Sequence, residues 1–199
     1  MAGLLLTFEG PEGAGKSTQV ARLQEQLRDR DVEVHREPGS TRLGDRVREL
    51  LLNGAAVNPE AEMFLFMAAR AELIGERILP ALRRGAIVIL DRYHDSTLAY
   101  QGGGRGLETS WPTFFPKPDR TYLLALPPEI SLRRLSDADR IEREPLEFHQ
   151  AVAKAYERLA AAEPKRWMVL DATASPEAIH EIVRSDLAGF LKRSQPSSS

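Results

Sequence analysis

The chain has 199 residues, of which 42% are apolar and 28% are charged, and its formal net charge is −2. This composition predicts one globular domain, which we place at residues 1–193 before a disordered tail at 194–199. It argues against a nucleic-acid or membrane partner. The sequence contains no cysteine, which excludes disulfides and thiolate metal sites. No stretch is apolar enough to span a bilayer, and the N-terminus has no signal-peptide pattern. We therefore expect a cytoplasmic protein.

The first predicted strand, residues 4–8, leads directly into Gly-Pro-Glu-Gly-Ala-Gly-Lys-Ser at 10–17. This is the strand–GxxxxGK[ST]–helix pattern of a phosphate-binding P-loop, whose glycines let backbone N–H groups surround a phosphate. Lys16 can reach the β- and γ-phosphates, and the Ser17 hydroxyl can ligate Mg²⁺. The predicted nucleotide-phosphate site consists of Gly10, Pro11, Glu12, Gly13, Ala14, Gly15, Lys16, Ser17 and Thr18.

Strand and helix patterns alternate along the rest of the chain. Four more short apolar runs predict strands at 32–35, 86–90, 121–126 and 167–170. Helical patterns lie between them, beginning with residues 19–30. Asn58 and Ser175 each precede a proline as helix N-caps, and Gly85 stands where a C-cap is expected. The alternation predicts an α/β fold, a P-loop NTPase-type three-layer sandwich whose five-stranded parallel sheet has helices on both faces.

Polar clusters follow the first three predicted strands in turn: the P-loop, then residues 37–39, then residues 91–93. Ligands of such sheets bind beyond the carboxyl ends of the strands, so these clusters predict one shared cleft. Asp91 has the position of a Walker-B acid that holds Mg²⁺ together with Ser17. Arg92 is suited to bind an anionic acceptor. The plainer alternatives are a helix N-cap for Asp91 and a surface salt bridge for Arg92.

Four segments, at residues 8–13, 36–39, 91–106 and 139–142, carry a more specific signal. The third contains Asp91-Arg92-Tyr93, Ser96, Ala99-Tyr100-Gln101-Gly102 and Gly104-Arg105-Gly106. In this order they resemble the signature motifs of bacterial thymidylate kinases, which are P-loop nucleoside monophosphate kinases. The resemblance covers about residues 3–190. A lone P-loop would indicate only a superfamily, whereas the four segments together indicate one family.

The resemblance implies an enzyme that transfers the ATP γ-phosphoryl group to dTMP in dTTP biosynthesis, with Mg²⁺ as cofactor and a homodimer as assembly. It implies that Arg92 holds the acceptor phosphate, that Glu12 lies near the 3′-hydroxyl, and that Tyr100 crowds the sugar 2′ position. Phe66 and Arg70 should bind thymine by stacking and hydrogen bonding. Residues four apart share a helix face, although a buried phenylalanine beside a snorkelling arginine is the simpler alternative. The implied dTMP-binding residues are Glu12, Arg36, Pro38, Phe66, Arg70, Arg92, Ser96, Tyr100 and Gln101.

Phosphoryl transfer depends on alignment and charge neutralisation, and the ionised dTMP phosphate needs no general base. The implied catalytic residues are Lys16, Arg92, Arg140 and Glu12. Some relatives carry an arginine in the P-loop, whereas here the corresponding residue is Gly13, so the sequence resembles the type that supplies an arginine from a lid. We predict a short lid around 134–144, mobile at 136–144, with Arg140 as its first candidate cation. Arg134 and Arg143 rank behind it, and a solvated, salt-bridged helix face that includes Arg133 is the alternative.

The chain departs from the family pattern at several places. Ser40 replaces a usual second glycine, Ala125 stands at an often acidic strand end, and residues 106–118 and 136–139 are short. Adenine contacts are poorly marked, with the turn at 172–174 as a weak candidate. Two rival functions remain: a related kinase acting on dCMP, UMP or a nucleoside, and a P-loop switch. The switch lacks support because the sequence has no Asn-Lys-x-Asp motif and no Asp-x-x-Gly motif after a strand.

Overall fold

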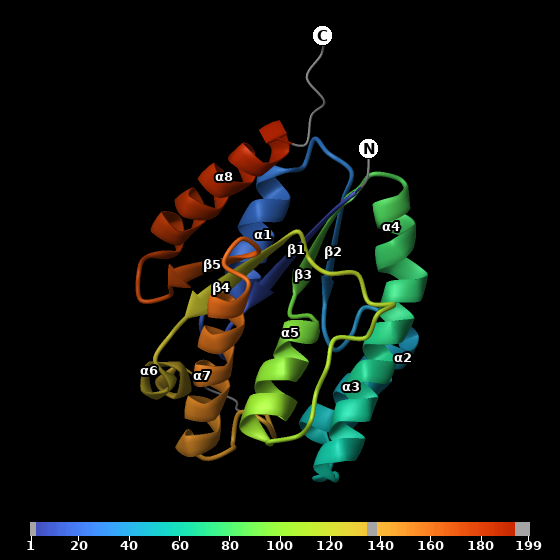
Figure 1. The fold of residues 1–199 in the computed structure, drawn as a ribbon, viewed down its shortest axis with the longest axis vertical. Helices are drawn as coiled ribbons and strands as arrows, with labels where there is room; N and C mark the ends of the chain where they lie inside the picture. Colours follow the sequence, from blue (N-terminus) through green and yellow to red (C-terminus); the bar gives the residue numbers. More distant parts are fainter. Residues whose placement is uncertain (1–2, 135–138, 194–199) are drawn as a thin grey trace.

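The apolar runs form one parallel sheet, as predicted (Figure 1). The computed structural model describes residues 3–134 and 139–193; the predicted tail and residues 135–138 of the predicted lid lie outside them. The sheet has five strands in the order β2-β3-β1-β4-β5. The strands are β1 (Leu4–Glu9), β2 (Val32–Arg36), β3 (Ile87–Asp91), β4 (Arg120–Ala125) and β5 (Trp167–Asp171). The predicted α/β fold class is confirmed, with strand bounds shifted by a residue.

Helices and π-helical turns connect the strands. They are α1 (Lys16–Gln26), α2 (Arg42–Arg48), η1 (Glu49–Asn53), α3 (Pro59–Leu73), η2 (Ile74–Ile78), α4 (Leu79–Arg83), α5 (His94–Thr97), η3 (Leu98–Gly104), α6 (Pro128–Arg133), α7 (Leu146–Ala162) and α8 (Pro176–Arg193). The helix predicted at 19–30 was wrong at both ends. It starts earlier because it grows directly out of the P-loop, and it ends earlier because Arg28 and Arg30 donate to carbonyls three residues back.

The predicted helix caps are confirmed. The Asn58 side chain accepts from the amides of Glu60 at 2.9 Å and Ala61 at 3.3 Å. The Ser175 hydroxyl accepts from the amide of Ala178 at 3.2 Å. Gly85 has φ 87° just beyond the end of α4, the left-handed conformation expected of a helix C-cap.

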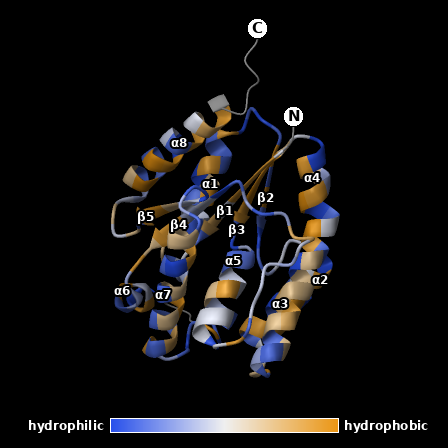
Figure 2. Cartoon of the chain, in the orientation of Figure 1, coloured by the Kyte–Doolittle hydropathy of each residue, from blue (hydrophilic) through white to orange (hydrophobic). Residues whose placement is uncertain are grey.

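Successive side chains of the strands enter different hydrophobic clusters on the two faces of the sheet. In β1, Leu6 and Phe8 pack in a cluster with residues of α1 and α8, whereas Leu5 packs in a cluster with residues of α3 and α4. Leu123 of β4 belongs to a third cluster with residues of α3, η3 and α7. Since successive side chains of a strand point to opposite faces, helices cover both faces of the sheet. Figure 2 shows the hydrophobic strands β1 and β3 between helices of mixed character.

The helical segment α5–η3 lies unusually close to α7. A Cβ on Gly103 would lie 2.4 Å from the Cβ of Ala155, and one on Gly104 would lie 2.5 Å from the Phe148 ring. These glycines therefore allow the two helices to approach closely. The same π-helical turn carries Tyr100 and Gln101 toward the site described below.

The carboxyl ends of β1, β2 and β3 meet at one edge of the sheet. In the strand register, Asp91 lies opposite Phe8 of β1 on one side and Arg36 of β2 on the other. The polar residues that follow these strands are therefore neighbours, as the sequence predicted. Within the described part of the chain, no helix has the length and hydropathy needed to cross a membrane.

Candidate active site

The phosphate-binding loop connects β1 to α1. Gly10 has φ 131°, and a Cβ there would lie 2.4 Å from the carbonyl oxygen of Leu124, so the loop requires glycine at this position. Helix α1 starts directly after Gly15, and among the described residues no side chain caps it. Its first N–H groups therefore form an anion site. The predicted loop residues all lie on the loop or in the first turn of α1: Gly10, Pro11, Glu12, Gly13, Ala14, Gly15, Lys16, Ser17 and Thr18.

Lys16 folds back over the loop. Its Nζ donates to the carbonyl oxygens of Gly10 at 3.1 Å and Pro11 at 2.7 Å. Burial, followed by the positive charge of Arg92, lowers the pKa of Lys16 to about 8. The ammonium is therefore held at the mouth of the loop by weak carbonyl partners, which an anionic phosphate can replace.

Ser17 and Asp91 form an oxygen pair beside Lys16. The Ser17 hydroxyl donates to Asp91 Oδ2 at 2.5 Å, which joins the first turn of α1 to the end of β3. Mg²⁺ prefers oxygen ligands and is usually bound by one or two protein groups together with substrate phosphates. The donor chemistry of this pair fits that ion.

Arg92 is placed by an uncommon backbone conformation. Its φ is 72°, a left-handed value that non-glycine residues adopt rarely and mostly at functional sites. The Arg92 amide donates to the carbonyl oxygen of Phe8 at 3.0 Å, so β1 holds the backbone in place. The side chain consequently leaves the end of β3 toward the P-loop.

The Arg92 guanidinium is held at both of its ends. Nη2 donates to Glu12 Oε1 at 2.6 Å and to the Tyr100 hydroxyl at 3.2 Å, while Nη1 donates to Ser96 Oγ at 3.2 Å. Burial alone would raise the pKa of Glu12, but the charges of Arg92 and Lys16 outweigh it and lower that pKa. Glu12 is thus ionised. The Arg92–Glu12 pair places one positive and one negative group side by side in the wall of one cavity.

These groups line a single pocket of about 250 Å³. It contains all of the predicted dTMP-binding residues: Glu12, Arg36, Pro38, Phe66, Arg70, Arg92, Ser96, Tyr100 and Gln101. It also contains Gly13, Lys16, Ser17 and Asp91, so the phosphate loop and the predicted acceptor site share one cavity.

Arg70 also lines this pocket and is held by several hydrogen bonds. It is 2% exposed, its Nε donates to Glu37 Oε2 at 2.5 Å, and its Nη1 donates to Thr97 Oγ1 at 2.8 Å. Nη2 donates to the Tyr93 carbonyl oxygen at 3.1 Å. Phe66 lies one turn earlier on α3 and lines the same pocket. Both side chains are buried and line the pocket. The guanidinium is hydrogen-bonded inside the protein, so Arg70 does not snorkel to solvent, and the thymine-binding role stays a prediction.

Arg140 makes no described contact with the phosphate loop. Its Nε donates to the Leu51 carbonyl oxygen at 2.8 Å, and its guanidinium forms an ion pair with Glu62, which is 1% exposed. Gln101 Nε2 also donates to Glu62, at 3.0 Å. Arg140 therefore joins the segment after the undescribed residues to α3, and it does not line the pocket.

Arg134 is the lid arginine that the structure brings to the P-loop. Its Nη1 donates to the carbonyl oxygens of Gly13 at 3.1 Å and Ala172 at 3.4 Å. It thereby links the loop to the turn at 172–174. Arg133 and Arg143 are exposed, in line with the solvated alternative for these two residues.

Several pocket residues were missed by the sequence analysis. Arg48, Leu52 and Thr97 line the cavity, and Arg48 Nη1 donates to the Pro38 carbonyl oxygen at 3.2 Å. Burial, followed by the charge of Arg36, lowers the pKa of Arg48. These residues lie within helical patterns, where nothing in the sequence distinguishes a pocket-facing arginine from a surface one.

The departures from the family pattern have structural counterparts. Ser40 has φ 65°, which explains why a glycine is usual there, and its hydroxyl accepts from the Arg36 amide at 3.1 Å. Residues 106–118 contain no helix. The carbonyl oxygen of Ala125 accepts from the Ala172 amide at 2.9 Å, so this position serves the β4–β5 pairing.

Comparisons with known proteins agree with this geometry. The thymidylate kinase family profile matches residues 8–183. A thymidylate kinase of Thermomicrobium roseum is 47% identical over 205 residues, covering 96% of this chain and 98% of the relative. One of Deinococcus radiodurans is 48% identical over 184 residues, covering 86% and 89%. The crystal structure of thymidylate kinase from Ehrlichia chaffeensis matches with a TM-score of 0.76 at 28% identity, covering 94% of this chain and 99% of that chain.

Proposed function

The chain belongs to the thymidylate kinase family, and from that premise we propose that it transfers the γ-phosphoryl group of ATP to dTMP, giving dTDP and ADP for dTTP biosynthesis. One observation carries the proposal: Lys16 and Ser17 of the P-loop line the same pocket as Arg92, Phe66 and Arg70. A cavity lined both by a phosphate-binding loop and by a buried guanidinium and aromatic ring suits a donor phosphate facing a nucleotide acceptor.

The donor phosphates bind the P-loop amides, and Lys16 exchanges its contacts with Gly10 and Pro11 for phosphate oxygens. Ser17 and Asp91 are the groups that would hold Mg²⁺, which when bound neutralises charge on the donor phosphates. In this proposal the turn at 172–174 borders the adenine, because Arg134 links it to Gly13.

The acceptor phosphate binds Arg92. Guanidinium groups bind phosphate through two parallel hydrogen bonds, and Glu12, which now accepts from Arg92 Nη2 at 2.6 Å, yields part of this contact. An ionised oxygen of the dTMP phosphate attacks the γ-phosphorus, and the bond to the β–γ bridging oxygen breaks as the new bond forms. No proton is transferred, so the residues act by alignment and charge neutralisation.

Phe66, Arg70, Tyr100 and Gln101 account for base and sugar recognition in this proposal. Phe66 offers a ring for stacking, and the Arg70 guanidinium, fixed by Glu37 and Thr97, offers a donor to a base oxygen. Tyr100 and Gln101 line the same pocket, and the Tyr100 hydroxyl accepts from Arg92. A rigid tyrosine there disfavours the added hydroxyl of a ribonucleotide.

For the lid cation we propose Arg134 ahead of Arg140. Arg134 already contacts the Gly13 carbonyl of the P-loop, whereas Arg140 would have to leave Glu62 and Leu51 to reach a phosphate. A homodimer, a cytoplasmic location and a single domain over residues 1–193 complete the proposal, and the family resemblance supports them.

Coupled measurement of ADP release with ATP·Mg²⁺ and a panel of monophosphates tests this function. We expect turnover to require dTMP and to be much slower with dCMP, UMP or thymidine. Faster turnover with one of those acceptors would identify the related-kinase alternative. ADP release that ignores every acceptor would favour the switch alternative and contradict the proposal.

A further inference from the structure

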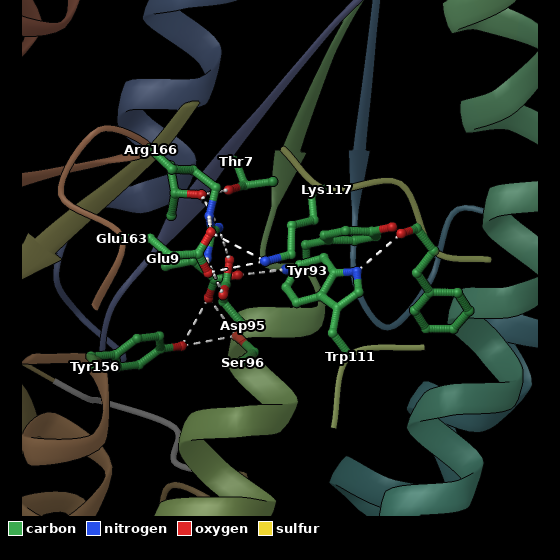
Figure 3. Close-up of polar contacts among 12 residues, drawn as sticks. Thr7, Glu9, Tyr93, Asp95, Ser96, Trp111, Lys117, Tyr156, Glu163 and Arg166 are labelled. Atoms are coloured by element: carbon green, nitrogen blue, oxygen red, sulfur yellow. Dashed lines mark hydrogen bonds and ion pairs between the residues drawn. The ribbon is translucent and has the colours of Figure 1, made fainter. Parts of the chain in front are cut away.

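Glu9 is a buried carboxylate that the proposed chemistry does not use. It ends β1, immediately before the P-loop, and is 0% exposed. Oε1 accepts from the Tyr93 amide at 2.8 Å, and Oε2 accepts from the Ser96 hydroxyl at 2.6 Å and the Tyr156 hydroxyl at 2.8 Å. Figure 3 shows both hydroxyls directed at this carboxylate from two different helices.

The same two hydroxyl oxygens contact Arg92. Nη1 of Arg92 lies 3.2 Å from Ser96 Oγ and 3.4 Å from Tyr156 Oη. Each hydroxyl has one proton and two lone pairs, whereas a guanidinium has only donors. The two hydroxyl oxygens also lie 2.9 Å apart, so the carboxylate competes with this contact for their protons; when both protons face Glu9, both oxygens present lone pairs to Arg92. Arg92 then donates to both hydroxyls, and both hydroxyls donate to Glu9.

Removal of the carboxylate acceptor would reverse this direction. A neutral donor at the position of Glu9 would turn one or both hydroxyl protons toward Nη1 of Arg92. An O–H donor would then face an N–H donor of the guanidinium. The guanidinium would then keep only its contacts with Glu12 and Tyr100. These lie on Nη2, the end that the acceptor phosphate must share with Glu12.

We propose that Glu9 is a positioning residue that orients the Ser96 and Tyr156 hydroxyls as acceptors and thereby fixes the Arg92 guanidinium toward the acceptor phosphate. The inference rests on the proposed function, because it takes Arg92 as the group that binds that phosphate. It adds a residue that touches neither substrate and acts only through Arg92.

The test compares dTMP with thymidine, which lacks the phosphate, by calorimetric binding to the full chain at pH 8, where Glu9 is ionised. Glu9→Gln keeps the shape of the side chain, and Tyr156→Phe removes one hydroxyl with little change in shape. Asp186→Asn is the matched control, because Asp186 likewise accepts from a tyrosine hydroxyl (Tyr122, 3.0 Å) and an arginine (Arg120, 2.8 Å) away from the pocket.

We expect Glu9→Gln to reduce the preference for dTMP over thymidine at least tenfold, with thymidine affinity within about twofold of the wild type. Tyr156→Phe should reduce it less, and Asp186→Asn should not change it. If Glu9→Gln does not fold, Tyr156→Phe gives the same comparison. An unchanged preference, or an equal loss of both ligands, would overturn the positioning role. A wild type without any preference for dTMP would instead overturn the proposed function.

Discussion

Three arginines in or near the site are each paired with a carboxylate, and this decides what they can bind. Arg92 pairs with Glu12 at the pocket wall, Arg70 pairs with Glu37 where both side chains are nearly inaccessible, and Arg140 pairs with Glu62. Side chains fixed before substrate arrives reduce the ordering cost of the reaction. Arg134, which contacts only carbonyl oxygens in the described contacts, is the freer cation.

This contrast predicts different outcomes for two lid substitutions. Arg134→Ala should lower kcat by about 10²-fold, because a donor aimed at developing charge is lost, and should leave the KM for dTMP within about threefold. Arg140→Ala should lower kcat far less and the free energy of unfolding by about 2 kcal/mol, because Glu62 loses a charged hydrogen-bond partner. Steady-state kinetics and urea denaturation measure both.

The reverse pattern would restore Arg140 as the lid cation. A large loss of kcat in Arg140→Ala with unchanged stability would mean that Arg140 leaves Glu62 during turnover. Unchanged kcat in Arg134→Ala would remove Arg134 from the catalytic residues.

The π-helical segment η3 has a strict packing requirement. It lies against α7 through Gly103 and Gly104, and it positions Tyr100 and Gln101 in the pocket. The glycine-rich sequence after Gln101 therefore allows η3 to pack against α7, in addition to being a family motif. Gly75 of η2 differs, because a Cβ there would meet nothing within 4 Å.

Alanine substitutions at Gly103 and Gly75 should have opposite effects on stability. Gly103→Ala places a methyl group 2.4 Å from the Ala155 Cβ, so we expect a loss of about 1–3 kcal/mol of stability and a higher KM for dTMP. Gly75→Ala, the matched control, should gain about 0.5–1 kcal/mol, because alanine favours the helix. Equal stabilities of the two variants in urea denaturation would contradict the close approach of η3 to α7.

The sequence predicted the elements well because their signals are local. The apolar runs of the strands, the P-loop glycines and the caps at Asn58 and Ser175 depend on neighbours in the chain. The predicted pocket residues converged because parallel strands end at one edge of the sheet. Helix α1 was placed too late because the P-loop hides its start, which lies directly after Gly15.

The contacts that depend on distant segments could not be predicted. Glu62 accepts hydrogen bonds from Gln101 and Arg140, which lie 39 and 78 residues away in the sequence. No spacing rule connects these three residues. Arg48 looks like any arginine of an amphipathic helix until the fold turns it toward Pro38. The Glu9 network likewise requires α5 and α7 to meet at the end of β1.

For the molecule as a whole, buried carboxylates set the pH dependence of stability. Burial, followed by the charge of Asp95, raises the pKa of Glu9 from 4.5 to about 7, and the charge of Arg92 only partly opposes this. Between these values the folded protein binds more protons than the unfolded chain, so stability is lost as pH rises through about 7. The pKa of Glu12 is lowered, so its contribution is lost in acid.

Thermal denaturation at pH 5.5 and pH 8 tests this sign. The wild type should lose stability toward pH 8, and Glu9→Gln should lose less, by no more than about 3 kcal/mol. The difference between the two proteins isolates Glu9 from the other carboxyl groups. Parallel stability curves would contradict the raised pKa.

The alignment of donor and acceptor is tested most directly by a crystal structure with dTMP and a non-hydrolysable ATP analogue. We expect the thymine between Phe66 and Arg70, the dTMP phosphate on Arg92, and one of its oxygens within about 3.5 Å of the γ-phosphorus, in line with the bond that breaks. A dTMP phosphate bound away from Arg92, or pointing away from the P-loop, would contradict in-line transfer in this pocket.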